Sequence, residues 1–115
     1  MEKLEDKILT MIFNITVLKN DFIQKYEKID LNNKDLLELL FLQDELFFWL
    51  MLMRLGKKIN KEKKKEIERL LDNTYIKVLQ FYGKYLIDYV DDKEQKEIEK
   101  ILKNVKNDDF VPLDL

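Results

Sequence analysis

The scarcity of residues that break helices constrains this chain more than any other feature. Only two glycines and one proline occur in 115 residues, while leucine, lysine, glutamate and isoleucine dominate. Few positions can therefore turn the chain, and helix is favoured almost throughout. The sequence predicts an all-α fold, a compact up-down bundle of about four helices that dimerisation could complete.

Hydrophobic periodicity delimits four helical segments, over residues 2–29, 34–55, 61–90 and 93–105. We expect residues 1–105 to form a single helical-bundle domain and residues 106–115 to form a C-terminal tail. Residues 30–33 and Asn60 offer N-caps for the second and third segments. Gly56 can take the left-handed conformation that ends a helix. Asp92 and Gln95 have the spacing of a capping box for the fourth segment.

Residue types that carry much of enzyme chemistry are absent. The chain contains no His, Cys, Ser or Ala. It therefore has no Ser-His or Cys-His nucleophile pair, no imidazole or thiolate ligand for a metal, and no disulfide. We expect a protein that is not an enzyme and that uses neither a cofactor nor a metal ion.

Charge and the N-terminus bear on location and partners. With 21 Lys plus Arg against 23 Asp plus Glu, the net charge is −2, so no global field attracts nucleic acid or an anionic membrane. The N-terminal residues do not form a basic region followed by an apolar run, so we expect no secretory signal and a cytoplasmic location.

The first segment has two apolar faces. Apolar residues that recur every seven positions predict a core face, at Ile8, Ile15, Phe22 and Ile29. A second line points largely away from that face and consists of Leu9, Phe13 and Val17. Exposed apolar lines commonly mark an interface. We expect these three residues to contact a protein partner or, in a homodimer, a second copy of the chain.

The second segment is apolar in every direction, with 15 apolar residues among the 20 from 36 to 55. We expect such a helix to be surrounded, either at the centre of the bundle or in the core of a dimer. A membrane span is not expected, because charged and amide residues interrupt the segment at 38 and 43–45. Three polar residues are candidates for burial with a partner: Gln43, Asp44 and Arg54. They could form polar contacts in the bundle core or at an interface, or they could lie at its rim.

The third segment carries a heptad seam of Leu71, Tyr75, Val78, Tyr82, Tyr85 and Tyr89. The opposite side is expected to be a polar face, formed by Asn73, Lys77, Gln80, Lys84 and Asp88. Tyrosines near lysines could stack single-stranded nucleic acid, but the lysines lie far around the helix, so a core stripe is favoured. Across the bundle we expect burial of Ile8, Ile15, Phe22, Leu46, Trp49, Leu71, Val78 and Tyr82.

A basic turn occupies residues 57–69. It contains Lys57, Lys58, Lys61, Lys63, Lys64, Lys65 and Arg69 against three glutamates, a local net charge of +4. Positive charge at a helix start opposes the macrodipole and could attract an anion or nucleic acid. The turn lacks interleaved aromatic residues, so we favour a solvated segment over a binding site.

The tail mixes acidic residues with large apolar ones, at Phe110, Val111, Leu113 and Leu115. It resembles the acidic, apolar-tipped tails with which some DNA-maintenance proteins recruit partners. Docking back onto the bundle is an equal alternative to binding a partner.

The stretch from Glu45 to Gly56 resembles the apolar helix that follows the second acidic motif of all-α nucleoside triphosphate pyrophosphohydrolases of the MazG type. Those enzymes hold Mg²⁺ with carboxylates in a paired E-x-x-E and E-x-x-D pattern. This chain does not reproduce the pattern, because Leu42 stands three residues before Glu45. The resemblance therefore indicates shared helix composition.

Three classes of function remain. The first is a non-enzymatic protein–protein interaction module of the adaptor, immunity or inhibitor type that acts through its apolar helix faces, and this is the class we favour. The second is an auxiliary helical subunit of a nucleic-acid-associated complex that uses the basic turn at 57–69. The third is an Mg²⁺-dependent all-α nucleotide pyrophosphohydrolase.

Overall fold

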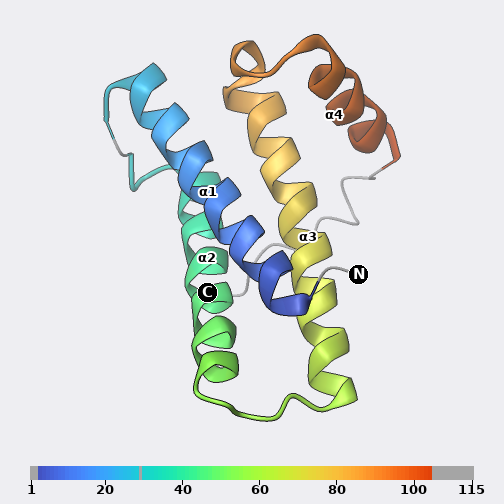
Figure 1. Ribbon diagram of the computed structural model, residues 1–115. Helices are drawn as coiled ribbons and strands as arrows, with labels where there is room; N and C mark the ends of the chain where they lie inside the picture. Colours follow the sequence, from blue (N-terminus) through green and yellow to red (C-terminus); the bar gives the residue numbers. More distant parts are fainter. Residues whose placement is uncertain (1–2, 29, 105–115) are drawn as a thin grey trace.

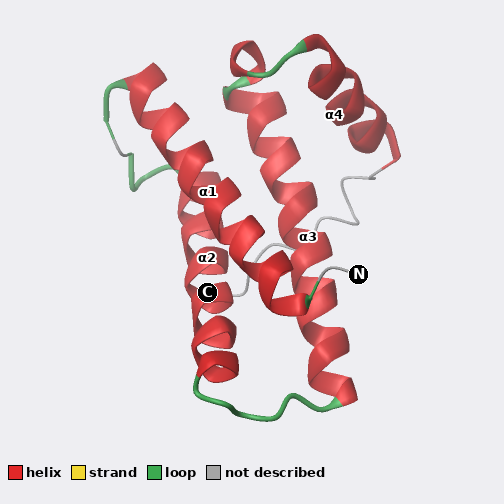
Figure 2. Ribbon diagram, viewed as in Figure 1, coloured by secondary structure: helices red, strands yellow, loops and turns green. Residues whose placement is uncertain are grey.

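A computed structural model describes residues 3–28 and 30–104, without the side chains of Leu102 and Asn104. The described residues form four α-helices and no strand. The helices are α1 (Leu4–Tyr26), α2 (Lys34–Arg54), α3 (Lys61–Tyr85) and α4 (Asp92–Asn104), and a short 3₁₀ turn, η1 (Ile87–Tyr89), joins the last two. Figure 2 shows helices joined by short loops, which confirms the all-α fold.

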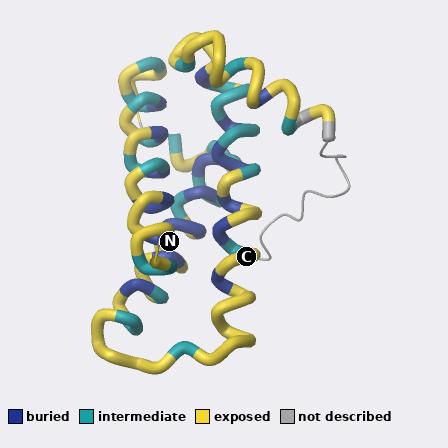
Figure 3. The backbone as a smooth tube through the Cα atoms, turned by 45° about the vertical axis from the view of Figure 1, so that its right-hand side comes forward, coloured by how far each residue is buried: buried dark blue, intermediate teal, exposed yellow. Residues whose placement is uncertain are grey.

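The first three helices form the main body of the bundle. Figure 1 shows α2 and α3 running in opposite directions and α1 lying obliquely across both, while α4 turns back beside the upper part of α3. The buried residues line the inner sides of these helices (Figure 3). None of the helices in the described part of the chain is long and apolar enough to cross a membrane.

Local chemistry explains where α2 and α3 begin. The side-chain oxygen of Asn33 accepts a hydrogen bond from the Leu36 amide, and that of Asn60 accepts one from the Lys63 amide. Each interaction satisfies a backbone donor that the helix itself leaves unpaired. Gly56 has a φ of 77° just after α2 ends, a conformation that costs glycine little. The predicted caps of α2 and α3 and the predicted stop after α2 are therefore confirmed.

The expected third segment is too long. The structure ends α3 at Tyr85 rather than at residue 90, and Tyr89 lies in η1, outside the heptad seam. The side-chain amide of Gln95 donates to the carbonyls of Ile87 and Val90, which satisfies backbone groups of the turn. The cap of α4 also differs from the expected Asp92, because the Asp91 carboxylate accepts from the Glu94 amide.

Six of the eight residues expected in the core are buried: Ile8, Ile15, Phe22, Leu46, Leu71 and Val78. Trp49 and Tyr82 are only partly buried and pack against the core from its edge. Both carry a polar group on a large ring, and such residues commonly keep that group at the boundary with water.

Two polar contacts cross the interior. Gln43 is buried, and its amide nitrogen donates to the Ile12 carbonyl and the Thr16 hydroxyl, each at 2.9 Å. Lys77 is only 7% exposed and forms an ion pair with Glu38 of α2. The expectation that Lys77 belongs to a solvated polar face is therefore wrong. Its ammonium group faces a neighbouring helix, which the periodicity of α3 alone does not indicate.

Candidate functional site

The outward side of α2 carries large apolar residues that are open to solvent, together with the exposed Asp44 and Glu45. Phe48 is 54% exposed and Met51 is 59% exposed, and Phe41, Phe47 and Leu55 are exposed as well. The expectation that α2 is surrounded is therefore wrong for the single chain. The other helices cover only one side of α2, formed by Leu36, Leu39, Leu42, Gln43, Leu46 and Leu50.

The register between α1 and α2 extends this surface onto α1. Gln43 contacts Ile12 and Thr16, and Arg54 pairs with Glu5 at 3.1 Å. Phe47 lies between Gln43 and Arg54 on α2, so it falls at the level of Leu9 on α1. Leu9 and Phe13 stand three positions before Ile12 and Thr16, so they lie on the next row of the α1 surface, beside the residues that contact α2. We call the combined surface the α1–α2 apolar face: Leu9, Phe13, Phe47, Phe48, Met51 and Leu55.

The α1–α2 apolar face is large for a single chain. A large side chain buries roughly 150–250 Å², and these six are between 37% and 68% exposed. Together they therefore present roughly 600 Å² of surface. The largest apolar patch of a typical monomer is about 300–600 Å², so this face lies at the upper limit.

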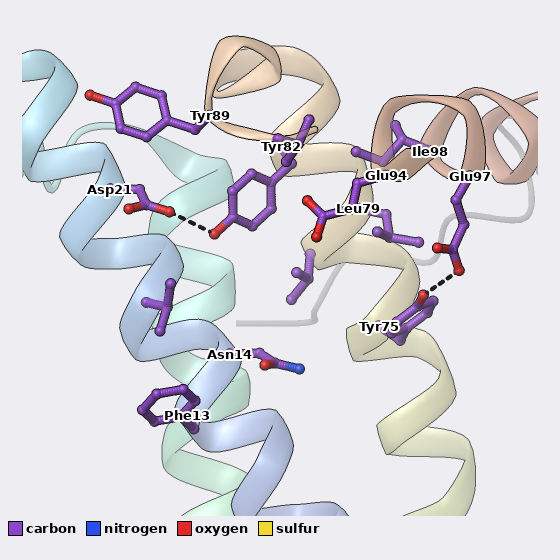
Figure 4. A pocket seen from close by; sticks show the side chains of 13 residues that line it. Phe13, Asn14, Asp21, Tyr75, Leu79, Tyr82, Tyr89, Glu94, Glu97 and Ile98 are labelled. Atoms are coloured by element: carbon purple, nitrogen blue, oxygen red, sulfur yellow. Dashed lines mark hydrogen bonds between the residues drawn. The ribbon is translucent and has the colours of Figure 1, made fainter. Parts of the chain in front are cut away.

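The sequence-predicted interface residues do not all belong to this face. Leu9 and Phe13 do, and Phe13 is 64% exposed. Val17 and Phe13 line a pocket of about 410 Å³ that is walled by α1, α3, η1 and α4 (Figure 4). The apolar and aromatic lining consists of Phe13, Val17, Tyr75, Val78, Leu79, Tyr82, Tyr89, Val90 and Ile98.

Carboxylates complete the pocket. The Tyr82 hydroxyl donates to Asp21 Oδ2 at 2.9 Å, and the Tyr75 hydroxyl donates to Glu97 Oε1 at 2.9 Å. Glu94 reaches from α4 towards the space beside Tyr82 and Leu79 (Figure 4). Burial raises the pKa of the Tyr82 phenol, and the hydrogen bond to Asp21 and the negative charge of Glu94 raise it further.

The three polar residues singled out on α2 have different surroundings. Gln43 is buried, and its amide nitrogen donates a hydrogen bond to the Ile12 carbonyl of α1. Asp44 and Arg54 are exposed in the single chain, so they lie at its surface rather than in the bundle core, and their burial at an interface stays a prediction. They lie outside the side of α2 that packs on α1 and α3, and Arg54 instead reaches the exposed Glu5.

The basic turn is mostly solvated. Its residues Lys57, Lys58, Lys61, Lys63, Lys64, Lys65 and Arg69 are all exposed. Lys63 pairs with Glu66 at 3.5 Å and lies 5.9 Å from the centroid of the Trp49 ring. These contacts hold one lysine near the bundle and leave the others directed into solvent.

Two further expectations concern a metal site and the C-terminal tail. Within residues 3–28 and 30–104, no group of three or more acidic side chains is placed to hold a metal ion. Phe110, Val111, Leu113 and Leu115 of the expected tail lie outside the described residues.

Sequence reasoning missed the pocket. Glu94 and Glu97 lie three residues apart on one helix face, but no spacing connects either of them with Asp21 on α1. They come together because η1 turns α4 back beside α3. An early end to α3 was the signal that could have revealed this arrangement, but the seam continues to Tyr89 in the sequence.

Comparison with known proteins gives no relative. No family model matches the chain, and searches of curated proteins and of solved structures find no significant match.

Proposed function

We propose that the chain is a protein–protein interaction module whose α1–α2 apolar face binds the same face of a second copy. The observation that carries this proposal is the solvent exposure of Phe13, Phe48 and Met51 on two adjacent helices. Removing apolar surface from water contributes about 25 cal/mol per Å². Association would recover the stabilisation that the single chain forgoes on this side.

A second copy fits the face in area and in charge. A standard interface buries about 800 Å² on each partner, and the roughly 600 Å² of the six apolar side chains supplies most of that area. None of the six is charged, so pairing the same surface from two copies brings no like charges together at its centre. Such a symmetric contact is the commonest form of homodimer.

Symmetry also gives the exposed Asp44 a partner. Met51 is the midpoint of the stretch from Phe47 to Leu55 on α2. If two antiparallel copies of α2 are related by a twofold axis near Met51, Asp44 of one copy lies near the C-terminal end of α2 in the other, where the loop that carries Lys57 and Lys58 begins. Asp44 and Lys58 are both exposed in the single chain, so an ion pair at the edge of the interface would orient the two copies.

The test measures molar mass by light scattering after size exclusion, at micromolar concentration. The chain should elute with a mass near twice 14.1 kDa. The double variant Phe48→Glu and Met51→Glu should be monomeric with unchanged helical circular dichroism. Leu31→Glu is the matched control, because Leu31 is 62% exposed but lies in the α1–α2 connection. A wild-type chain that stays monomeric at 100 times that concentration would refute the proposal.

The pairing geometry can be tested separately. Asp44→Lys should weaken the dimer, because it places two lysines near each other. Adding Lys58→Asp should restore the dimer, since the ion pair is then reversed. Failure of the second change to restore a dimer that the first has weakened would exclude the twofold axis near Met51.

A further inference from the structure

The pocket between α1, α3 and α4 has the dimensions of a small-ligand site. Its volume is about 410 Å³, within the range of about 300–1,000 Å³ that is usual for such sites. Its α1 wall runs from Phe13 to Asp21, which corresponds to about 12 Å of helix at 1.5 Å per residue. The pocket could therefore take a molecule that spans two helical turns.

The charge of the pocket is one-sided. Asp21, Glu94 and Glu97 supply three carboxylates, and the described residues that line the pocket include no Lys or Arg. This absence is notable because 21 of the 115 residues are Lys or Arg. The pocket therefore disfavours an anion and attracts a cation.

The three carboxylates are not equivalent. Asp21 and Glu97 each accept a tyrosine hydroxyl. The carboxylate of Glu94 makes no hydrogen bond or ion pair with another residue in the described part of the chain. Its charge is nevertheless felt across the pocket, because it raises the pKa of both Tyr75 and Tyr82. Glu94 is thus the group that a bound cation would meet first.

The apolar wall specifies the rest of the ligand. Phe13, Val17 and Leu79 all line the pocket. A small hydrated metal ion would leave these groups in contact with water, whereas an aryl or alkyl body would cover them. The acidic tail of this chain is a poor occupant, because Asp108, Asp109 and Asp114 would be repelled.

We propose that this pocket binds a small organic cation, in which an ammonium group that pairs with Glu94 is carried on an apolar body that packs against Val17 and Leu79. This site goes beyond the proposed dimer and does not depend on it. Glu94 and Leu79 lie outside the α1–α2 apolar face.

Three probes that share one body test the proposal: 4-phenylbutylammonium, 4-phenylbutanol and 4-phenylbutyrate. Each is titrated into the ¹⁵N-labelled protein, and amide chemical shifts give the dissociation constant and the location. The cation should bind about tenfold more tightly than the neutral alcohol, as expected for a charge-assisted contact, and the carboxylate should bind least. The largest shifts should fall at Val17, Leu79 and Glu94.

Matched variants separate charge in the pocket from charge on the helix. Glu94→Gln should weaken binding of the cation about tenfold and leave the alcohol unchanged. Glu99→Gln removes the same charge from an exposed position of α4 that does not line the pocket, so it should leave both constants unchanged. Equal affinity for all three probes, or no effect of Glu94→Gln, would overturn the proposal.

Repeating the titration with the variant Phe48→Glu and Met51→Glu distinguishes the pocket from the dimer surface. Retained binding with shifts at Glu94 supports the pocket, whatever the oligomeric state. Shifts confined to residues 47–55 in the wild type, and lost in this variant, would show that the probes bind only the α1–α2 apolar face.

Discussion

α2 and α3 lie antiparallel in the same bundle, yet they distribute polarity in opposite ways. α2 directs Phe48 and Met51 into solvent, whereas α3 directs Asn73 and Lys84 outwards and buries Lys77. The outer side of α3 is therefore polar, as expected for a surface in contact with water. The outer side of α2 instead exposes large apolar residues, and packing within the single chain does not account for them. The comparison teaches that packing of the core accounts for one side of α2, and that the proposed association would account for the other.

The largest expected effect separates the two sides of α2. Leu46 is fully buried and Phe48 is half exposed. Leu46→Ala should lower the free energy of unfolding of a monomeric variant by roughly 2–5 kcal/mol. Phe48→Ala should change it by less than about 0.5 kcal/mol. Urea unfolding followed by circular dichroism measures both, and similar losses would mean that the outer side of α2 is part of the core.

The second effect concerns the buried ion pair that joins α2 to α3. Glu38→Gln should lower the free energy of unfolding by about 3 kcal/mol, because it leaves the Lys77 ammonium buried without its countercharge. The double variant Glu38→Leu and Lys77→Met should recover most of that loss, since it removes both charges. Thermal unfolding of the three proteins provides the measurement. A neutral Glu38→Gln would mean that Lys77 reaches water.

A smaller effect, with a pH signature, is expected at the edge of α3. Tyr82→Phe removes the hydrogen bond to Asp21 and should cost about 1 kcal/mol. Burial and Asp21 raise the pKa of Tyr82 above its usual value, so the folded state holds that proton more tightly than the unfolded state. The contribution is therefore complete below about pH 10 and is lost as the pH rises further. Unfolding curves between pH 8 and 11 should fall less steeply for Tyr82→Phe than for the wild type.

The last effect, small for each residue, tests the solvated side of α3. Lys61 and Lys64 lie at the start of the helix, where positive charge opposes the macrodipole. Changing both to Glu should raise the free energy of unfolding by about 0.3–1 kcal/mol for each residue. Binding of labelled single-stranded RNA, measured by fluorescence anisotropy at low salt, checks the alternative role. Measurable binding that the double variant abolishes would favour the nucleic-acid class of function.

Local patterns predicted the helices well because the relevant chemistry is local. Asn33 and Asn60 cap helices through amides three residues away, and the seven-residue recurrence of Ile8, Ile15 and Phe22 requires only helical geometry. The same periodicity predicted the buried residues, except Trp49 and Tyr82, which are only partly buried.

The features that were missed depend on contacts between distant segments. Lys77 is buried because Glu38 of another helix reaches it. α3 ends early because Gln95, ten residues beyond Tyr85, stabilises the turn. The pocket needs that turn as well. Periodicity identified Phe13 as exposed, but it could not indicate that α4 places Glu94 opposite it.

The end of α1 is bonded to the end of α3, whereas α4 lies beyond this contact. Lys25 Nζ and the Tyr26 hydroxyl both donate to the Tyr85 carbonyl, at 2.8 and 3.0 Å, and Lys25 also pairs with Asp88. These bonds tie α1 to the last residue of α3 just before η1. Beyond that point, among the α4 residues whose side chains the structure describes, Ile98 is buried, Gln95 and Ile101 are partly buried, and the others are exposed.

α4 can therefore open as a local unit while the three longer helices stay closed. Its amides should exchange with deuterated solvent through this local opening, faster than those of α1 or α3. Glu94 and Tyr75 at the pocket are exposed in the closed bundle, so a ligand can reach the pocket without this opening. A ligand held there would slow exchange in α4 and leave exchange in α2 unchanged.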